Sequence, residues 1–233
     1  MRGEGGLAAH TPPLHRGPPI FFPGGIFRGK FPHQTSSEDN KKVIMIELPN
    51  GYCFVNHADW SKRPLGGRGW RGGPVLQKKG VTDVFIHHSV TAVSGDPALA
   101  GVRDPSDDPC RDARIIEDIL AERNLLPGYS YVIHPSGVVL EMAGDYIGAH
   151  TQDHNSSSKG LCFIGNYDKA QPTLAQLVAA ARTVNLMRAG GQLAGDLSKI
   201  KIQGHRDTKS TACPGANLYP VIGFIRKFAA DNN

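Results

Sequence analysis

Short runs of apolar residues, separated by Gly, Pro, Asn and Ser, predict a series of strands along the chain. Two of these runs flank Pro135-Ser136-Gly137 and two others flank Pro49-Asn50-Gly51, so each pair predicts a hairpin. The predicted strands are Val43–Leu48, Tyr52–Val55, Val84–His87, Tyr131–His134, Val138–Met142, Leu161–Ile164 and Ile200–Ile202.

Apolar positions three and four residues apart predict three helices. The first covers Arg114–Arg123 and the last covers Leu218–Phe228. The middle helix starts with Thr173 and Gln176 in the pattern of a capping box, and Gly190-Gly191 is expected to end it. Its expected apolar face consists of Leu174, Leu177, Val178, Ala181 and Val184.

Strands interspersed with helices predict an α/β protein in which helices pack on a sheet. Residues 81–233 hold most of this pattern and form the predicted main domain. Within it, Ser89–Asp112 contains Pro and Asp and is expected to be a long loop. Residues 43–80 are expected to form a short hairpin and a basic Gly/Arg-rich connector. Residues 1–42, rich in Gly and Pro without a hydrophobic period, are expected to be disordered.

The net charge of +5 is unevenly distributed along the chain. Residues 1–80 contain 12 Lys and Arg against 5 Asp and Glu, whereas residues 81–233 contain 14 against 16. A basic segment can bind an anionic partner such as a wall polymer, a membrane surface or nucleic acid, but composition alone favours a solvated tail. We do not expect a nucleic-acid-binding protein, since the main domain is slightly acidic and has no recognised binding motif. No run of 18 apolar residues is present, so no membrane insertion is expected.

Three segments concentrate side chains that bind transition metals. Ile86-His87-His88 ends a predicted strand, Gly204-His205-Arg206-Asp207 follows another, and Cys213 lies in the next loop. Catalytic zinc takes three protein ligands, often imidazole and thiolate, and keeps one position open. His87 and His88 point to opposite faces of their strand, so only one of them can be a ligand. His134, in the second hairpin, is expected to be an exposed polar residue.

The main domain resembles the zinc-dependent N-acetylmuramoyl-L-alanine amidases of the phage-lysozyme and peptidoglycan recognition protein type. The resemblance runs in order through residues 81–228. It rests on Val84–Ser89, Pro127–Tyr131 with the hairpin that follows, Ile147–His150, Cys162–Asn166, Gly204–Asp207 and Thr211–Gly215. The resemblance implies a mixed central β-sheet flanked by helices, with the metal in a surface groove.

The resemblance also implies the roles of individual residues. By position it makes Zn²⁺ ligands of His87, His205 and Cys213, and catalytic residues of Tyr129 and Thr211. The phage-lysozyme branch has a lysine where this chain has Thr211, whereas recognition-protein amidases often have threonine. His150 lies where related proteins contact the glycopeptide, which implies a role in substrate binding.

The function implied is hydrolysis of the amide bond between N-acetylmuramic acid and L-alanine in peptidoglycan by a zinc-activated water. Cys213 at the ligand position, and the lack of a carboxylate in Leu161–Ile164, argue against the cytoplasmic anhydromuropeptide branch. The alternative is a non-catalytic peptidoglycan-binding module of the same fold, which the intact Cys213 disfavours.

We expect a monomer that is made in the cytoplasm and acts on the cell wall. The chain starts without the apolar run of a signal peptide, so a phage endolysin or a bacteriolytic, antimicrobial protein released by a non-classical route is expected.

Overall fold

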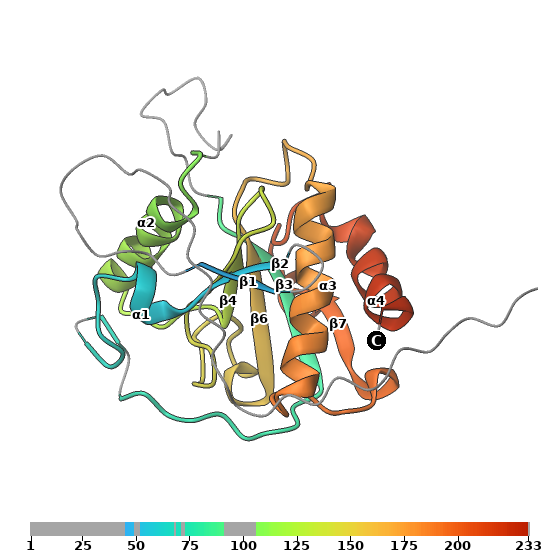
Figure 1. Cartoon of the computed structure of the whole chain (residues 1–233), viewed down its shortest axis with the longest axis horizontal. Coiled ribbons are helices and arrows are strands. Elements are labelled where there is room, and N and C mark those ends of the chain that lie inside the picture. Colours follow the sequence, from blue (N-terminus) through green and yellow to red (C-terminus); the bar gives the residue numbers. More distant parts are fainter. Residues whose placement is uncertain (1–44, 49–51, 68, 71–72, 91–105, 233) are drawn as a thin grey trace, which may run out of the picture.

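The structure is a computed structural model that describes residues 45–48, 52–67, 69–70, 73–90 and 106–232 (Figure 1). Residues 1–42, predicted to be disordered, and residues 91–105 of the predicted loop lie outside the described residues. The strands are β1 (Met45–Leu48), β2 (Tyr52–Val55), β3 (Asp83–His88), β4 (Tyr131–Ile133), β5 (Val139–Glu141), β6 (Ser158–Phe163) and β7 (Lys201–Gly204). The α-helices are α1 (His57–Trp60), α2 (Pro109–Glu122), α3 (Leu174–Ala189) and α4 (Ile222–Asp231). The 3₁₀-helices are η2 (Asn155–Ser157), η3 (Leu197–Lys199), η4 (His205–Asp207) and η5 (Tyr219–Val221).

The strands form one mixed sheet in the order β1-β2-β5-β4-β6-β3-β7. Its centre is parallel, because β6 pairs with both β4 and β3, and β3 pairs with β7. The two predicted hairpins, β1–β2 and β4–β5, are antiparallel. The carboxyl ends of β4, β6, β3 and β7 therefore open at the same edge of the sheet.

Helices cover both faces of the sheet, with α3 and α4 on one side and α1 and α2 on the other (Figure 1). Alternation along the strands divides the core between these layers. Ile86 and Phe163 pack in the cluster of α3 and α4, whereas Cys162 and Ile164 pack in the cluster of α2. The arrangement confirms the predicted mixed sheet with flanking helices.

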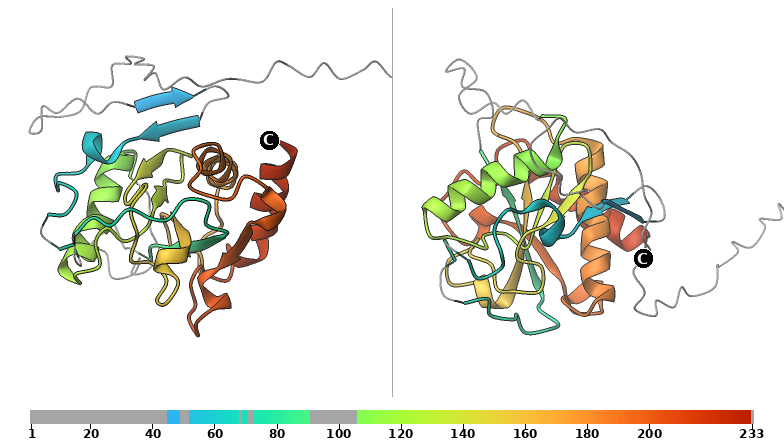
Figure 2. Two further views of the ribbon diagram at one scale, coloured as in Figure 1. Left: turned by 90° about the horizontal axis from the view of Figure 1, so that it is seen from below. Right: turned by 60° about the vertical axis from the view of Figure 1, so that its left-hand side comes forward.

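The N-terminal hairpin is continuous with the main domain. Strand β2 pairs in parallel with β5, and β1 and β2 form one margin of the sheet (Figure 2). Trp60 is 2% exposed and donates its indole N–H to the carbonyl of Glu141 at 2.8 Å. Further along, the backbone N–H of Gln77 donates to the carbonyl of Asp145 at 2.9 Å. The division expected at residue 81 marks where the motifs begin, but sheet and core cross it.

Helix α2 begins at Pro109, whereas the periodicity predicted a start at Arg114. The carboxylate of Asp108 accepts the backbone N–H groups of Cys110 at 2.9 Å and Arg111 at 3.1 Å. Asp108 is therefore an N-cap and Pro109 a favourable first helical residue, although both resemble loop residues in the sequence. The predicted loop Ser89–Asp112 therefore ends too late, because its last four residues, 109–112, form the first turn of α2.

Helix α3 has the predicted capping box. Thr173 Oγ1 accepts the N–H of Gln176 at 3.1 Å, and Gln176 Oε1 accepts the N–H of Thr173 at 3.1 Å. Leu174 was expected on the apolar face but is 66% exposed, because the helix meets the sheet only from Gln176, which is fully buried. Among the described residues, no helix combines the length and apolar character needed to cross a bilayer.

Candidate metal centre

Three potential metal ligands meet at the carboxyl edge of the sheet. His87 is the next-to-last residue of β3, His205 follows β7 directly, and Cys213 lies in the loop beyond. Strands β3 and β7 pair with Ile86 opposite Gly204, so the register brings the two histidines together. The ligand atoms of His87, His205 and Cys213 all lie within 4.8 Å of one another. The structure thus assembles the three residues that the resemblance implied.

The spacing of these donor atoms suits zinc. The Nδ1 of His87 lies 3.6 Å from the Sγ of Cys213, and the rings of His87 and His205 have centroids 4.6 Å apart. Tetrahedral zinc, with a Zn–S distance of about 2.3 Å and Zn–N distances of about 2.0–2.1 Å, places a sulfur and a nitrogen ligand about 3.6 Å apart. Two imidazoles and one thiolate leave a fourth position open, which is typical of catalytic zinc.

Burial sets the protonation of the three side chains. It lowers the pKa of His87 well below its usual value, and neighbouring histidines lower it further. Burial also lowers the pKa of His205, and it raises the pKa of the Cys213 thiol to about 11, opposed by a hydrogen bond from the His88 backbone. Neutral imidazoles can coordinate directly, whereas the thiol loses its proton when a metal binds.

His88 points to the opposite face of β3, as the alternation along the strand predicts. Its Nδ1 accepts the backbone N–H of Tyr167 at 3.3 Å. Burial is the main cause that lowers the pKa of His88 to about 4, so its ring is neutral. His87 is therefore the ligand candidate and His88 a histidine of the core.

Polar contacts fix the loop that carries Cys213. The backbone N–H of Arg206 donates to the Cys213 carbonyl at 3.1 Å, and its guanidinium lies 4.7 Å from the centroid of the Tyr219 ring. The carboxylate of Asp207 accepts the N–H of Gly204 at 2.8 Å and the hydroxyl of Tyr219 at 2.6 Å. Sequence reasoning found the motif that contains Arg206 and Asp207 but gave these two residues no role.

Tyr129 lies beside the candidate ligand His87. Its ring centroid is 5.2 Å from that of His87, and the side chain is half-buried against the α2 side of the core. Burial raises the pKa of Tyr129 well above its usual value, and the nearby thiols of Cys162 and Cys213 raise it further. The phenol is therefore protonated at neutral pH and can donate a hydrogen bond.

Thr211 lies next to Cys213, the candidate sulfur ligand. Its Oγ1 accepts the backbone N–H of Cys213 at 3.2 Å, which leaves the hydroxyl proton free of this contact. The nearby Lys209 points to Gln152, with 3.5 Å between its Nζ and the amide oxygen, and this contact is exposed. The loop therefore places Thr211 close to Cys213, and the catalytic role that the resemblance implied for Thr211 stays a prediction.

His150 packs behind His87 instead of standing at the surface. It is 7% exposed, and the two rings have centroids 5.3 Å apart. Its Nδ1 lies 3.0 Å from the Oγ1 of Thr151, which in turn lies 3.3 Å from the Nε2 of His87. The role of His150 in substrate binding stays a prediction. Sequence reasoning missed Thr151, because a lone threonine after a histidine carries no pattern.

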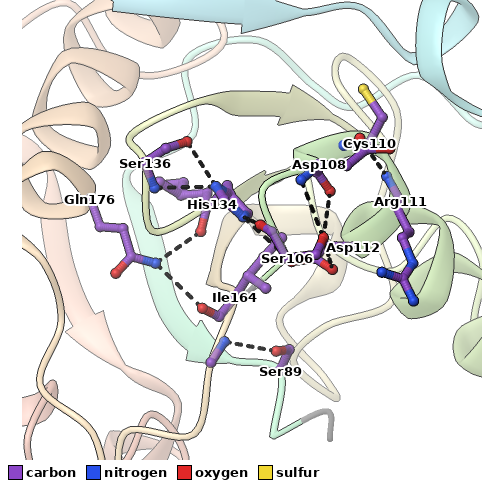
Figure 3. Close-up of polar contacts among 12 residues, drawn as sticks. Ser89, Ser106, Asp108, Cys110, Arg111, Asp112, His134, Ser136, Ile164 and Gln176 are labelled. Carbon is purple, nitrogen blue, oxygen red and sulfur yellow. Dashed lines mark hydrogen bonds and ion pairs between the residues drawn. The ribbon is translucent and has the colours of Figure 1, made fainter. Parts of the chain in front are cut away.

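A second polar cluster lies where β4 ends (Figure 3). His134 Nδ1 is 2.7 Å from Ser136 Oγ, and its Nε2 is 3.0 Å from the Ser106 carbonyl and 3.4 Å from the Asp112 carboxylate. His134 is 4% exposed, so the expectation of an exposed residue is wrong. It is buried because it ties the β4–β5 hairpin to the first turn of α2.

Comparison with known proteins agrees with this geometry. Residues 77–216, more than half of the chain, match the family described as N-acetylmuramoyl-L-alanine amidase. The chain belongs to this amidase family. Its relatives carry the names of both amidases and recognition proteins, so family membership alone leaves open whether this chain cuts peptidoglycan or only binds it.

Three similar proteins illustrate this range. Peptidoglycan-recognition protein SC2 of Drosophila simulans is 38% identical over 96 residues, which are 41% of this chain and 50% of that protein. Human N-acetylmuramoyl-L-alanine amidase is 31% identical over 163 residues, which are 69% of this chain and 27% of that protein. A mutant of Drosophila PGRP-LB in complex with tracheal cytotoxin is 25% identical, with a TM-score of 0.55 over 73% of this chain and 92% of that one. The chain spans half or less of the length of these two curated relatives.

Proposed function

We propose that this member of the amidase family is a zinc-dependent N-acetylmuramoyl-L-alanine amidase. It hydrolyses the amide bond between N-acetylmuramic acid and L-alanine in peptidoglycan. The observation that carries the proposal is the fit of His87, His205 and Cys213 to a tetrahedral zinc ion with one open position. Related structures bound to tracheal cytotoxin, a monomeric peptidoglycan, support the choice of substrate.

The residues around the centre suit amide hydrolysis. When bound, zinc lowers the pKa of a water molecule and polarises the scissile carbonyl. Tyr129, protonated at neutral pH, donates a hydrogen bond to the carbonyl oxygen as it gains negative charge. The hydroxyl of Thr211, held in place by the N–H of Cys213, is a second donor toward the same oxygen. Neither Tyr129 nor Thr211 has to change its protonation state before water attacks the scissile carbonyl.

A non-catalytic peptidoglycan-binding module is the second candidate, since recognition proteins are among the relatives. The half-buried thiol of Cys213 favours the enzyme, because a site that only binds a sugar-peptide has no need of a thiol beside two imidazoles. Action as a phage endolysin, or as a wall hydrolase released by another route, stays a prediction.

The test combines metal analysis with digestion of purified peptidoglycan by the full-length chain. We expect about one zinc per chain and new L-alanine amino termini, which a chelator abolishes and added zinc restores. Cys213→Ser should lose zinc and activity together, whereas Cys53→Ser, a half-buried cysteine on β2, should keep both. Peptidoglycan that is bound but never cut by the zinc-loaded protein would replace the enzyme with the binding module.

A further inference from the structure

The two ring nitrogens of His87 face different partners. Nδ1 lies 3.6 Å from the sulfur of Cys213, on the side of the metal centre. Nε2 lies 3.3 Å from the hydroxyl oxygen of Thr151, on the side of the protein interior. Both His87 and Thr151 are 1% exposed, so water does not compete for these contacts.

The two contacts determine which ring nitrogen of His87 carries the proton. A neutral imidazole has one N–H and one lone pair, and a metal ligand needs its lone pair on the side of the ion. If Nδ1 is the ligand atom, the proton lies on Nε2 and is donated to the oxygen of Thr151. The hydroxyl proton of Thr151 then has the Nδ1 of His150 as its acceptor, at 3.0 Å. The donors of His87 and Thr151 each find one acceptor, whereas His150 Nε2, which then carries the proton of that ring, has no hydrogen-bond partner among the described residues.

Thr151 is itself held firmly. The side-chain oxygen of Asn155 accepts the backbone N–H groups of His150 at 2.9 Å and Thr151 at 2.8 Å. The ring of His150 lies so close to β6 that a Cβ on Gly160 would be 2.5 Å from its Cγ. The hydroxyl of Thr151 therefore has a fixed place relative to His87.

We propose that Thr151 is a positioning residue of the metal centre, which holds His87 with its Nδ1 lone pair toward the ion. The inference rests on the proposed zinc site and adds a residue that acts on the metal centre through its contact with His87. Outer partners of metal-binding histidines are usually carboxylates or carbonyls, and their loss typically weakens metal binding by about 10–100-fold. Here a neutral hydroxyl, backed by a second histidine, takes that place.

Zinc affinity of the full-length chain, measured by competition with a chromophoric chelator, tests the proposal apart from activity. Thr151→Val removes the hydroxyl at nearly constant shape and should weaken zinc binding by about 10–100-fold. Thr151→Ser restores a hydroxyl and should bring the affinity back. Thr183→Val is the matched control, because Thr183 is also 1% exposed but donates to the Ala179 carbonyl within α3.

Each outcome decides the question. Equal zinc affinity of wild type and Thr151→Val overturns the proposal, and so does a Thr151→Ser variant as weak as Thr151→Val. A wild-type chain that takes up no zinc overturns it together with the metal site. If zinc binding follows the expected order but peptidoglycan stays intact, Thr151 keeps its role and only the amidase activity fails.

Discussion

The ring centroids of Tyr129 and His87 lie 5.2 Å apart, although Tyr129 precedes β4 and His87 is the next-to-last residue of β3, with β6 between these two strands. The contact across β6 is possible because the residue of β6 that pairs with His87 is Cys162, whose side chain is small. A phenol that precedes β4 and a candidate metal ligand on β3 thus share one site.

Tyr129→Phe tests whether the phenol of Tyr129 donates a hydrogen bond to the scissile carbonyl. We expect the rate of peptidoglycan hydrolysis to fall by about 10²–10³, as for other lost oxyanion donors, while the zinc content stays unchanged. The control is Tyr146→Phe, since Tyr146 is also half-buried but packs edge-on against Trp70. A Tyr129→Phe protein of full activity would remove this residue from the mechanism.

Gly215 tests how tightly the loop after Cys213 is packed, and Gly223 is its control. Gly215 has a φ of +102°, and a Cβ there would lie 2.5 Å from the carbonyl carbon of Tyr167. Gly215→Ala should therefore lower the free energy of unfolding by about 1–3 kcal/mol. Gly223→Ala, in α4 with open space around it, should raise it by up to about 1 kcal/mol. Urea unfolding of both variants measures the difference, and equal effects would contradict the crowding at Gly215.

The buried Lys159 predicts how the free energy of unfolding depends on pH. It is 1% exposed, and burial lowers its pKa from 10.5 to about 8, against the opposing charges of Asp145 and Glu141. Between these two values the unfolded chain binds more protons than the folded one, so this group makes stability rise with pH, by at most about 1.4 kcal/mol per pH unit.

Unfolding in urea across this window, pH 8 to 10.5, measures the slope. Lys159→Met should flatten it, whereas Lys201→Met, at an exposed position of β7, should leave it as in the wild type. The same slope in Lys159→Met and wild type would show that Lys159 titrates normally in the folded protein.

Asp108 tests the unexpected first turn of α2. Asp108→Ala leaves the N–H groups of Cys110 and Arg111 without their acceptor and should cost about 1 kcal/mol of stability. Asp107→Ala removes an exposed neighbouring charge and should change stability far less. The urea midpoint at constant m-value reports both effects, and a larger loss from Asp107→Ala would speak against the cap.

Local patterns predicted the strands and the capping box of α3, because these depend on neighbouring residues. Alternation along β3 limited the candidate ligand to one of His87 and His88, and in the structure it is His87 that lies close to His205 and Cys213. The start of α2 escaped prediction because Asp and Pro are common both in loops and at helix starts. Thr151 and the buried His134 escaped it because their partners, His87 and Asp112, are far away in the sequence and meet them only in the folded sheet.

The position of β3 between β6 and β7 has a consequence for biogenesis. His87 belongs to a strand whose two partners both come much later in the chain, and long-range parallel pairing forms slowly. Before β7 docks, the nascent sheet offers one imidazole in place of three ligands. If the chain binds zinc as proposed, the three candidate ligands come together only once β7 has paired with β3, so zinc binding would follow completion of the sheet.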